Sequence, residues 1–214
     1  MTGVAPPRVG ICDYGVGNLR SVERALVHGG ADPVVSGDPT ELATCDGLVL
    51  PGVGAFAVAA QALRGRKLDD AVRALANDGR PIMGVCLGFQ LLFSESDEGS
   101  GGVGLGLIPG HVRRLRPGAA KVPHMGWNRL HLTRASWLLD DVEDGQHMYF
   151  VHSYAATPDD AACVIAVTDH GVEIVAAVEA GNITGTQFHP EKSGEAGLRV
   201  YANFVARCVA PVRA

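Results

Sequence analysis

The sequence predicts an α/β fold with a mixed, mostly parallel central sheet, helices on both faces and antiparallel additions in the C-terminal half. In the first half, short apolar runs alternate with helical patterns, which is typical of a parallel sheet covered by helices. In the second half, apolar runs follow one another across short turn signals, which favours antiparallel strands. The length of 214 residues predicts a single domain over residues 1–214, in which residues 1–7 form a disordered start.

The first half contains the expected parallel strands and their helices. Strands are expected at residues 9–12, 34–35, 48–50 and 81–85. Helices are expected at 19–27, where Gly29 and Gly30 end the helical pattern, at 67–76 and at 87–93. This order implies parallel strands with covering helices.

The second half contains the expected antiparallel additions and a closing helix. Strands are expected at residues 148–154, 163–168, 172–178 and 183–188. The last segment has apolar residues at the three-and-four spacing of an amphipathic helix, which predicts a helix that packs on the sheet. These residues are Val200, Tyr201, Phe204, Val205 and Cys208.

Two segments between the halves have a biased composition. The glycine-rich stretch 99–110 is expected to be a long surface loop. The basic run 111–116, with Arg113, Arg114 and Arg116, has two interpretations. It belongs either to an exposed strand whose charges limit edge pairing or to a surface that meets an acidic partner, and the first is the commoner arrangement.

Composition and charge exclude several classes of function. The 18 basic and 23 acidic side chains give a net charge of −5, which argues against a nucleic-acid binder. Neither a signal peptide nor a membrane-spanning segment is expected, because the apolar stretches are short or broken by proline and glycine. The five cysteines are scattered, which fits a reducing, cytoplasmic setting. The histidine and cysteine spacing predicts no metal site.

The most informative local motif is the run Gly84-Val85-Cys86-Leu87-Gly88. An apolar strand pattern passes through this run into a helical pattern, as in a nucleophile elbow with cysteine as the nucleophile. The two glycines permit the sharp turn, and the N-terminus of the following helix favours the reactive thiolate. The alternative is that Cys86 is a buried apolar residue between two glycines.

A general base is suggested by His189-Pro190-Glu191, which follows the expected strand 183–188. Proline biases the residue before it away from helix, so the three residues are expected to be extended. Residues two apart in an extended chain point to the same side, which places the Glu191 carboxylate beside the His189 imidazole. Cys86, His189 and Glu191 would then form a nucleophile, base and orienting acid. The alternative for the tripeptide is an ordinary loop.

A third motif is the glycine-rich loop 51–56, which follows another strand end. Backbone N–H groups of Val53 and Gly54, joined by that of Leu87, are the expected donors of an oxyanion hole. The alternatives are a plain turn or a phosphate loop, but the lysine and serine or threonine of a phosphate loop are absent. A dinucleotide site at Gly15-Val16-Gly17 is a further alternative, although the third glycine of that motif is missing.

Together these motifs resemble the class I, triad-type glutamine amidotransferases, whose signatures are G-x-C-x-G-x-Q, a strand-end Pro-Gly loop and His-Pro-Glu. Within that family, the chain looks most like the glutaminase subunits of imidazole glycerol phosphate synthases of histidine biosynthesis. Pro51-Gly52-Val53-Gly54 is discriminating, because other branches usually have Pro-Gly-Gly there. The other segments behind this narrower resemblance are 13–19, 123–128, 150–154 and 189–193.

The resemblance implies a reaction and the residues that carry it. Cys86 would attack the amide carbon of glutamine, His189 would transfer the proton to the leaving ammonia, and Glu191 would hold the imidazole. Water would then hydrolyse the resulting thioester to glutamate. Carried over by position, Gln90 and Glu98 would contact the α-amino end of the substrate. Its length would lie along Gly52, Ser153 and Tyr154. No cofactor is implied.

The resemblance also implies a partner, which is a separate cyclase subunit with a (β/α)₈ barrel that receives the ammonia. The family has its subunit contacts and ammonia entrance at four positions, which here are Asn18, Trp127, Tyr149 and Lys192. Ordinary structural roles compete at each of them, such as core aromatics or a solvated charge. Other glutaminases of the class, serving anthranilate, pyridoxal or nucleotide synthesis, stay open as alternatives, as does a non-catalytic module on the same fold.

Overall fold

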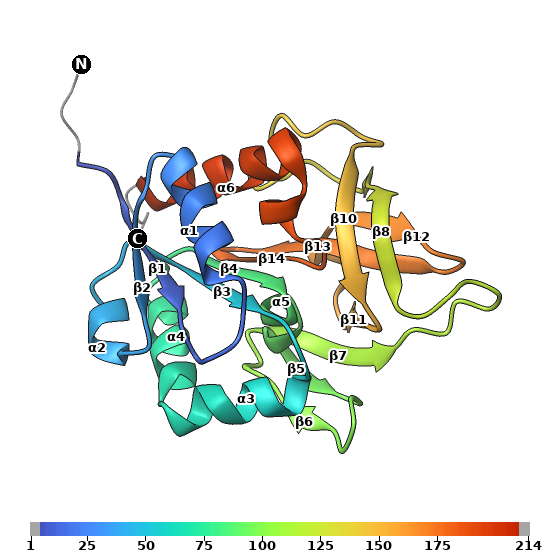
Figure 1. The fold of residues 1–214 in the computed structure, drawn as a ribbon, viewed down its shortest axis with the longest axis horizontal. Helices are drawn as coiled ribbons and strands as arrows, with labels where there is room; N and C mark the ends of the chain where they lie inside the picture. The colour runs from blue at the N-terminus through green and yellow to red at the C-terminus, as the bar shows by residue number, and fades with distance from the viewer. Residues whose placement is uncertain (1–4, 210–214) are drawn as a thin grey trace.

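A computed structural model describes residues 5–209 and has an eight-stranded central sheet (Figure 1). Strands β2, β1, β3, β4 and β14 are parallel, and β13, β12 and β9 extend the sheet in antiparallel pairings. This mixed, mostly parallel sheet is the predicted one. In order across the sheet the strands are β2 (Asp32–Ser36), β1 (Arg8–Cys12), β3 (Gly47–Gly52), β4 (Ile82–Cys86), β14 (Ile183–Thr186), β13 (Glu173–Ala180), β12 (Val164–Asp169) and β9 (His131–Leu132).

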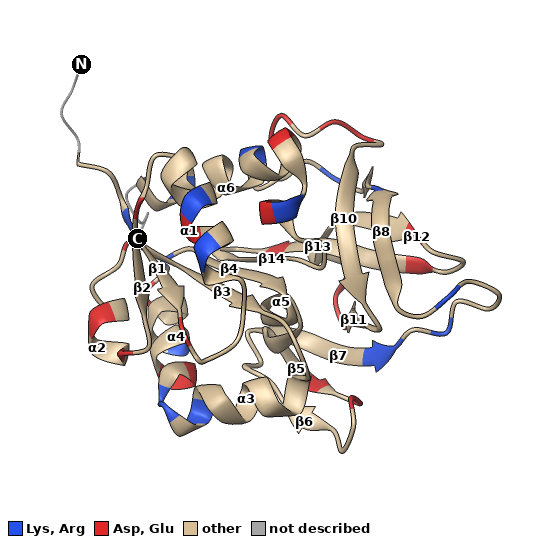
Figure 2. Cartoon of the chain, viewed as in Figure 1, with Lys and Arg blue, Asp and Glu red and all other residues tan. Residues whose placement is uncertain are grey.

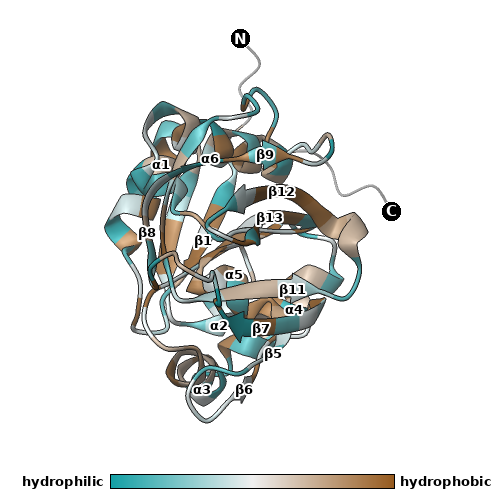
Figure 3. Ribbon diagram, turned by 90° about the vertical axis from the view of Figure 1, so that its right-hand side faces the viewer, coloured by the Kyte–Doolittle hydropathy of each residue, from teal (hydrophilic) through white to brown (hydrophobic). Residues whose placement is uncertain are grey.

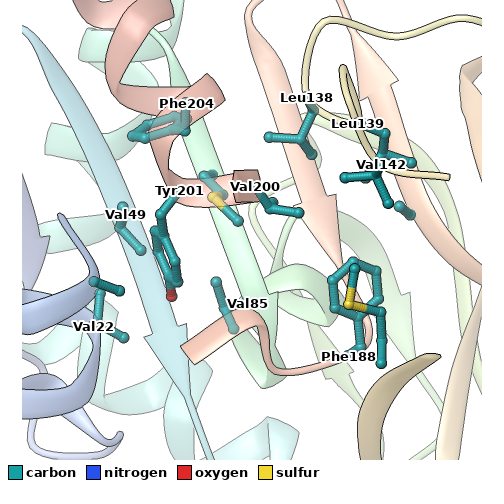
Figure 4. Close-up of a cluster of buried hydrophobic side chains, with 14 of the residues drawn as sticks. Val22, Val49, Val85, Leu138, Leu139, Val142, Phe188, Val200, Tyr201 and Phe204 are labelled. Carbon is teal, nitrogen blue, oxygen red and sulfur yellow. The ribbon is translucent and has the colours of Figure 1, made fainter. Parts of the chain in front are cut away.

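Helices cover both faces of the parallel part of the sheet (Figure 1). One face is covered by α1 (Leu19–His28) and α6 (Gly194–Val209). The other face is covered by α2 (Pro39–Leu42), α3 (Phe56–Gly65), α4 (Leu68–Asn77) and α5 (Leu87–Leu91). Each face therefore has its own core, and the cluster under α1 and α6 is drawn in Figure 4. The apolar stripe predicted for the closing helix is buried there.

Two smaller sheets lie beside the antiparallel end of the main sheet. One has the order β11 (Tyr154–Pro158), β7 (Ile108–Arg114), β5 (Phe93–Ser96) and β6 (Gly102–Val103), and the other pairs β10 (His147–His152) with β8 (His124–Arg129). Figure 3 views this side, with the apolar strands β12 and β13 in brown. A short 3₁₀ turn, η1 (Ala161–Cys163), precedes β12.

Several predicted elements differ from those observed. The helix expected at 87–93 ends at Leu91, and Phe93 begins β5. The expected loop at 99–110 contains β6 and the start of β7, because Leu105 and Ile108 are buried and anchor the segment. The glycine-rich loop after β3 leads into α3, a helix that the sequence patterns did not reveal.

The strand expected at 148–154 is also different. It is divided into β10 and β11, which join the two smaller sheets instead of the main one. The expected strand at 183–188 ends at Thr186, and it pairs in parallel with β4 as well as antiparallel with β13. The last parallel strand therefore lies beside the strand that ends at Cys86.

The basic run does not lie on a sheet edge. Strand β7 is paired on both sides, with β11 and with β5, so edge protection is the wrong explanation for its charges. His111 in this strand contacts the carboxylates of Glu95 and Asp97. Figure 2 shows Lys and Arg at the end of β7 and in the loop that follows it.

The described start of the chain is held in place. Residues 1–4 of the expected disordered start lie outside the described residues, but Pro7 is buried and its carbonyl accepts a hydrogen bond from Asp32 N–H. This corrects the expectation at Pro7. Within residues 5–209, no helix is long and apolar enough to cross a membrane, and no group of three or more His, Cys, Asp or Glu side chains could hold a metal ion.

Candidate active site

Cys86 lies at the sharp turn between β4 and α5. Its backbone has φ 54° and ψ −106°, a conformation that L-residues rarely adopt and that costs about 1–3 kcal/mol. Small neighbours allow the turn: a Cβ on Gly88 would overlap the carbonyl oxygen of Leu50, and one on Gly84 would lie 2.7 Å from the Gly88 carbonyl oxygen. The predicted elbow is therefore present, with its cysteine at the carboxyl end of a central strand.

His189 and Glu191 form a buried pair beside this turn. The His189 Nδ1 atom lies 2.7 Å from Glu191 Oε1, and both side chains are 2% exposed. His189 itself is extended, but the residues after it form the 3₁₀ turn η2 (Pro190–Lys192). The expectation that all three residues are extended is therefore wrong. The tight turn after Pro190 brings the carboxylate back to the imidazole, so the predicted contact forms by a different route.

The charge state of His189 follows from its two neighbours. Burial alone lowers the pKa of His189, but interactions with Cys86 and Glu191 favour the protonated ring and raise the pKa to about 9. Within residues 5–209, His189 Nε2 is buried and has no hydrogen-bond partner. The imidazole is therefore a strong base that is protonated near pH 7, and its Nδ1 is held by a carboxylate.

A cavity of about 430 Å³ opens in front of Cys86 and His189. Most of the predicted substrate and oxyanion residues line it, which are Val53, Gly54, Leu87, Gln90, Glu98, Ser153 and Tyr154. Gly52 lies beneath the cavity instead of lining it. A Cβ at Gly52 would overlap the Tyr14 hydroxyl and press on Leu87, so this glycine allows β3 to approach α5 closely.

Two of the lining side chains already have protein partners. The Gln90 amide donates to the Tyr154 carbonyl at 2.9 Å and to Gln187 Oε1 at 3.0 Å. Glu98 Oε2 accepts a hydrogen bond of 2.7 Å from Phe56 N–H at the first turn of α3. Among residues 5–209 the second oxygen of Glu98 and the amide oxygen of Gln90 have no partner, so both side chains retain an acceptor for a bound ligand.

Sequence reasoning missed Gln187 and the histidine pair, by which we mean His124 and His152. The Gln187 Nε2 atom lies 3.9 Å from the Cys86 sulfur. His152 also lines the cavity. The run 183–188 already contains Thr184 and Thr186, so the polar side chain of Gln187 gives no distinct signal in the sequence.

The histidine pair forms one directional chain of hydrogen bonds. His152 Nδ1 lies 2.8 Å from the Tyr154 carbonyl and must donate to it, so its Nε2 accepts from His124 Nδ1 at 2.9 Å. His124 Nε2 then accepts from the Asn128 amide at 3.1 Å. Burial, reinforced by neighbouring histidines, lowers the pKa of His152 to about 3 and that of His124 to about 4. Both rings are therefore neutral near pH 7.

Three of the four expected partner residues lie together next to the pair of His189 and Glu191. Trp127 is 57% exposed and its ring centroid is 6.1 Å from that of Tyr149. Lys192 Nζ lies 5.7 Å from the centre of the Tyr149 ring, and that ring is 6.5 Å from the ring of His189. Asn18 is exposed and precedes α1, where its carbonyl accepts the first hydrogen bonds of that helix.

Comparison with known proteins gives three kinds of match. The family model of class I glutamine amidotransferases matches residues 10–208. The chain is 54% identical over 197 residues to the imidazole glycerol phosphate synthase subunit HisH of Methanothermobacter thermautotrophicus, which covers 92% of this chain and 97% of that protein. It is 49% identical over 203 residues to the protein of the same name in Geobacillus thermodenitrificans, with 92% and 94% covered. Among solved structures, PurLQS from Thermotoga maritima has a TM-score of 0.74 at 24% identity, over 94% of this chain and 98% of that one, which shows the fold.

Proposed function

The chain belongs to the class I glutamine amidotransferase family, and we propose that it is the single-domain glutaminase subunit of an imidazole glycerol phosphate synthase. It hydrolyses L-glutamine and passes the ammonia to a cyclase subunit for histidine biosynthesis. The observation that carries this proposal is the strained turn at Cys86 beside the buried His189 and Glu191 pair, at the floor of one cavity. Relatives named for that synthase subunit support the choice of branch.

The first half of the reaction breaks the amide bond of glutamine. Cys86 Sγ, whose proton has passed to His189 Nε2, attacks the amide carbon. Interactions with Cys86 and with the Glu191 carboxylate at Nδ1 raise the pKa of His189 and so favour this imidazolium. The C–N bond of the tetrahedral intermediate then breaks, His189 gives its proton to the leaving nitrogen, and ammonia and a γ-glutamyl thioester result.

The second half regenerates the thiol. His189 removes a proton from a water molecule, and the hydroxide formed attacks the thioester carbon. The C–S bond breaks, glutamate leaves and Cys86 regains the proton. The imidazole alternates between its two protonation states, and Glu191 keeps the same nitrogen occupied throughout.

We propose that the remaining lining residues hold the substrate. Backbone N–H groups of Val53, Gly54 and Leu87 stabilise the oxyanion, and the free first N–H of α5 at Leu87 suits that role. The free oxygens of Gln90 and Glu98 bind the α-amino group of glutamine. The backbone at Ser153 and Tyr154 runs along the substrate, and Gly52 acts indirectly by allowing the close packing below.

The proposed partner is the cyclase subunit, a (β/α)₈ barrel that forms a heterodimer with this chain. Trp127, Tyr149 and Lys192 form the part of its contact surface next to the triad, and Asn18 contributes from the start of α1. Ammonia would leave between them, since Tyr149 lies between Trp127 and His189. All five cysteines are free thiols, which supports a reducing compartment such as the cytoplasm.

The nucleophile is tested by covalent labelling. A glutamine-like diazoketone should alkylate Cys86 before the other four cysteines, and peptide mass spectrometry identifies the site. Cys12, Cys45, Cys163 and Cys208 serve as internal controls, because all are buried and burial raises the pKa of each. Labelling of any of these while Cys86 stays free would show that the nucleophile is misassigned.

The partner is tested by measuring glutamate release. The isolated chain should turn over glutamine slowly, and the cyclase with its nucleotide should raise the rate about 10²–10³-fold, the effect of one correctly aimed oxyanion donor. The reason is that the loop around Gly54, which has φ 105°, can reorient at low steric cost. Cys86→Ala in the complex should still support synthesis from ammonium salts. Equal rates for the isolated chain and the liganded complex would favour a freestanding amidase.

A further inference from the structure

Besides His189 Nε2, two buried side-chain atoms in or near the triad have no hydrogen-bond partner within residues 5–209. One is the second carboxylate oxygen of Glu191, Oε2, and the other is the hydroxyl of Tyr201. Their side chains are nearly inaccessible, at 2% exposed for Glu191 and 0% for the whole of Tyr201. Unpaired polar groups are rare inside proteins because each costs a large part of its hydration free energy. Two such atoms in one region therefore call for a common explanation.

The fold places Tyr201 on the face of α6 that packs against the segment containing Glu191. Only Ser193 separates η2 from helix α6. The first turn of the helix packs closely on η2, since a Cβ on Gly197 would overlap the Pro190 carbonyl oxygen. Tyr201 is four residues after Gly197 and shares its helix face. Side chains in a helix lean toward its N-terminus, which here is the end that meets η2 and Glu191. In Figure 4 the ring of Tyr201 extends from α6, with its oxygen at the far end, between Val22, Val49 and Val85.

The chemistry of the two groups is complementary. An ionised carboxylate only accepts hydrogen bonds, and a protonated phenol donates one. Burial raises the pKa of Tyr201 well above its ordinary value, and the nearby Glu191 charge adds to that shift, so the phenol keeps its proton. The surroundings of Tyr201 are otherwise apolar, since Val22, Val49 and Val200 belong to the same buried cluster.

We propose that Tyr201 is a positioning residue of the triad, whose hydroxyl donates a hydrogen bond to one buried water that in turn donates to Glu191 Oε2. With Oε1 on His189 Nδ1 and Oε2 on this water, the carboxylate is held at both oxygens and its plane is fixed. The imidazole is then aimed at Cys86 by a chain of contacts that starts in the C-terminal helix. This proposal rests on the glutaminase function proposed above.

The test is removal of a single oxygen by Tyr201→Phe in the reconstituted complex. Loss of a hydrogen bond to a charged group should lower kcat about tenfold. KM for glutamine should stay within about twofold, because Tyr201 does not line the cavity. In a Glu191→Ala background the same substitution should change kcat less than about twofold, because both carboxylate oxygens are gone. Val200→Ala, which trims the neighbouring residue in the same cluster, controls for loss of packing and should leave kcat within about twofold.

Three outcomes would overturn the proposal. These are an unchanged kcat in Tyr201→Phe, an equal loss in both backgrounds, and a matching loss in Val200→Ala. The Nδ1 proton of His189, followed by NMR in the isolated chain, gives a readout that needs no turnover. Its resonance should shift in Tyr201→Phe and stay in place in Val200→Ala. If the wild-type complex fails to hydrolyse glutamine while this shift is seen, the proposed function fails and the contact with Glu191 stands.

Discussion

His189 and His152 line the same cavity and are 2% and 6% exposed, but near pH 7 His189 is protonated and His152 is neutral. The pKa of His189 is raised to about 9, whereas burial lowers the pKa of His152 to about 3. Burial acts in the same direction on both rings, so it does not explain the difference. The partners do: Cys86 and the Glu191 carboxylate favour the protonated form of His189, whereas the partners of His152 are a backbone carbonyl and a second imidazole.

This contrast shows that two regions of the molecule have different roles. The first is the triad region, and the second is the region of β8 and β10. The triad region, at the ends of β4 and β14, keeps a ring that can carry a proton during the reaction. The two-stranded sheet of β8 and β10 keeps its histidine pair neutral, and His152 of the pair donates a hydrogen bond to the Tyr154 carbonyl. A carboxylate partner makes a buried histidine a proton carrier, and neutral partners make it a structural group.

The largest expected effect separates the two regions by activity. His189→Asn should lower glutamine turnover by about 10⁴-fold, because the proton carrier is lost. His124→Asn, one ring away from the cavity residue His152, should lower it less than about tenfold. Steady-state glutamate release by the two variants in the complex provides the measurement. Similar losses for both would mean that the histidine pair takes part in proton transfer.

The next largest effect is expected from a substitution that gives His189 a neutral partner, like the partners of His152. Glu191→Gln leaves His189 in place with a neutral partner, so its pKa should fall well below 9 and turnover should drop by about 10³-fold. The pKa of His189, obtained by NMR titration of the ring, and the rate of Cys86 alkylation at pH 7 should both fall. A ring that still titrates near pH 9 would show that Cys86, and not Glu191, sets its charge state.

These outcomes bear on how much the sequence could predict. Cys86, His189 and Glu191 were found because each motif consists of neighbours in the chain, whose spacing is fixed by local geometry. The contact between His124 and His152 depends on the register of β8 against β10, which short motifs do not encode. Likewise, the route from His189 to Glu191 depends on the turn η2, which an extended-chain argument misses.

Helix α3 shows a second kind of limit. The glycines after β3 predict a loop, and the alanine-rich segment that follows it forms a helix that its sequence pattern alone does not indicate. Its start is fixed by a long-range contact, since Glu98 accepts the N–H of Phe56 from more than forty residues away. The predicted fold class is confirmed, because it needs only the order of strands and helices, whereas tertiary contacts decide the boundaries and the small sheets.

The third effect is on stability at low pH, and it concerns the histidine pair of β8 and β10. His124 and His152 have lowered pKa values in the fold, so the unfolded chain binds protons more readily below pH about 6.5. Their contribution to stability is complete above that pH and is lost as the pH falls toward 4 and 3. From pH 7 to 4.5, the free energy of unfolding should fall about 1–2 kcal/mol more in the wild type than in His124→Gln. The exposed His28→Gln variant, measured by urea unfolding alongside, should follow the wild type.

The smallest expected effect is on stability at alkaline pH, and it concerns His189 in the triad region. The pKa of His189 is raised, so its contribution to stability is complete below pH about 6.5 and is lost as the pH rises through about 9. Between pH 7 and 9.5 the wild type should lose about 1 kcal/mol more stability than Glu191→Gln. Parallel curves for the two proteins would place the raised pKa outside the contact with Glu191.

The strained backbone at Cys86 affects what an inherited substitution at this position would do. Its φ of 54° and ψ of −106° suit glycine far better than cysteine, so Cys86→Gly relieves strain of about 1 kcal/mol while removing the nucleophile. Such an allele makes a subunit that folds as well as the normal one or better, survives quality control and has no sulfur to react. It still presents the same surface to whatever binds the intact chain. The inactive subunit would therefore compete with the active one for the same binding partner. The loss of activity would grow with its abundance in a cell that carries both alleles.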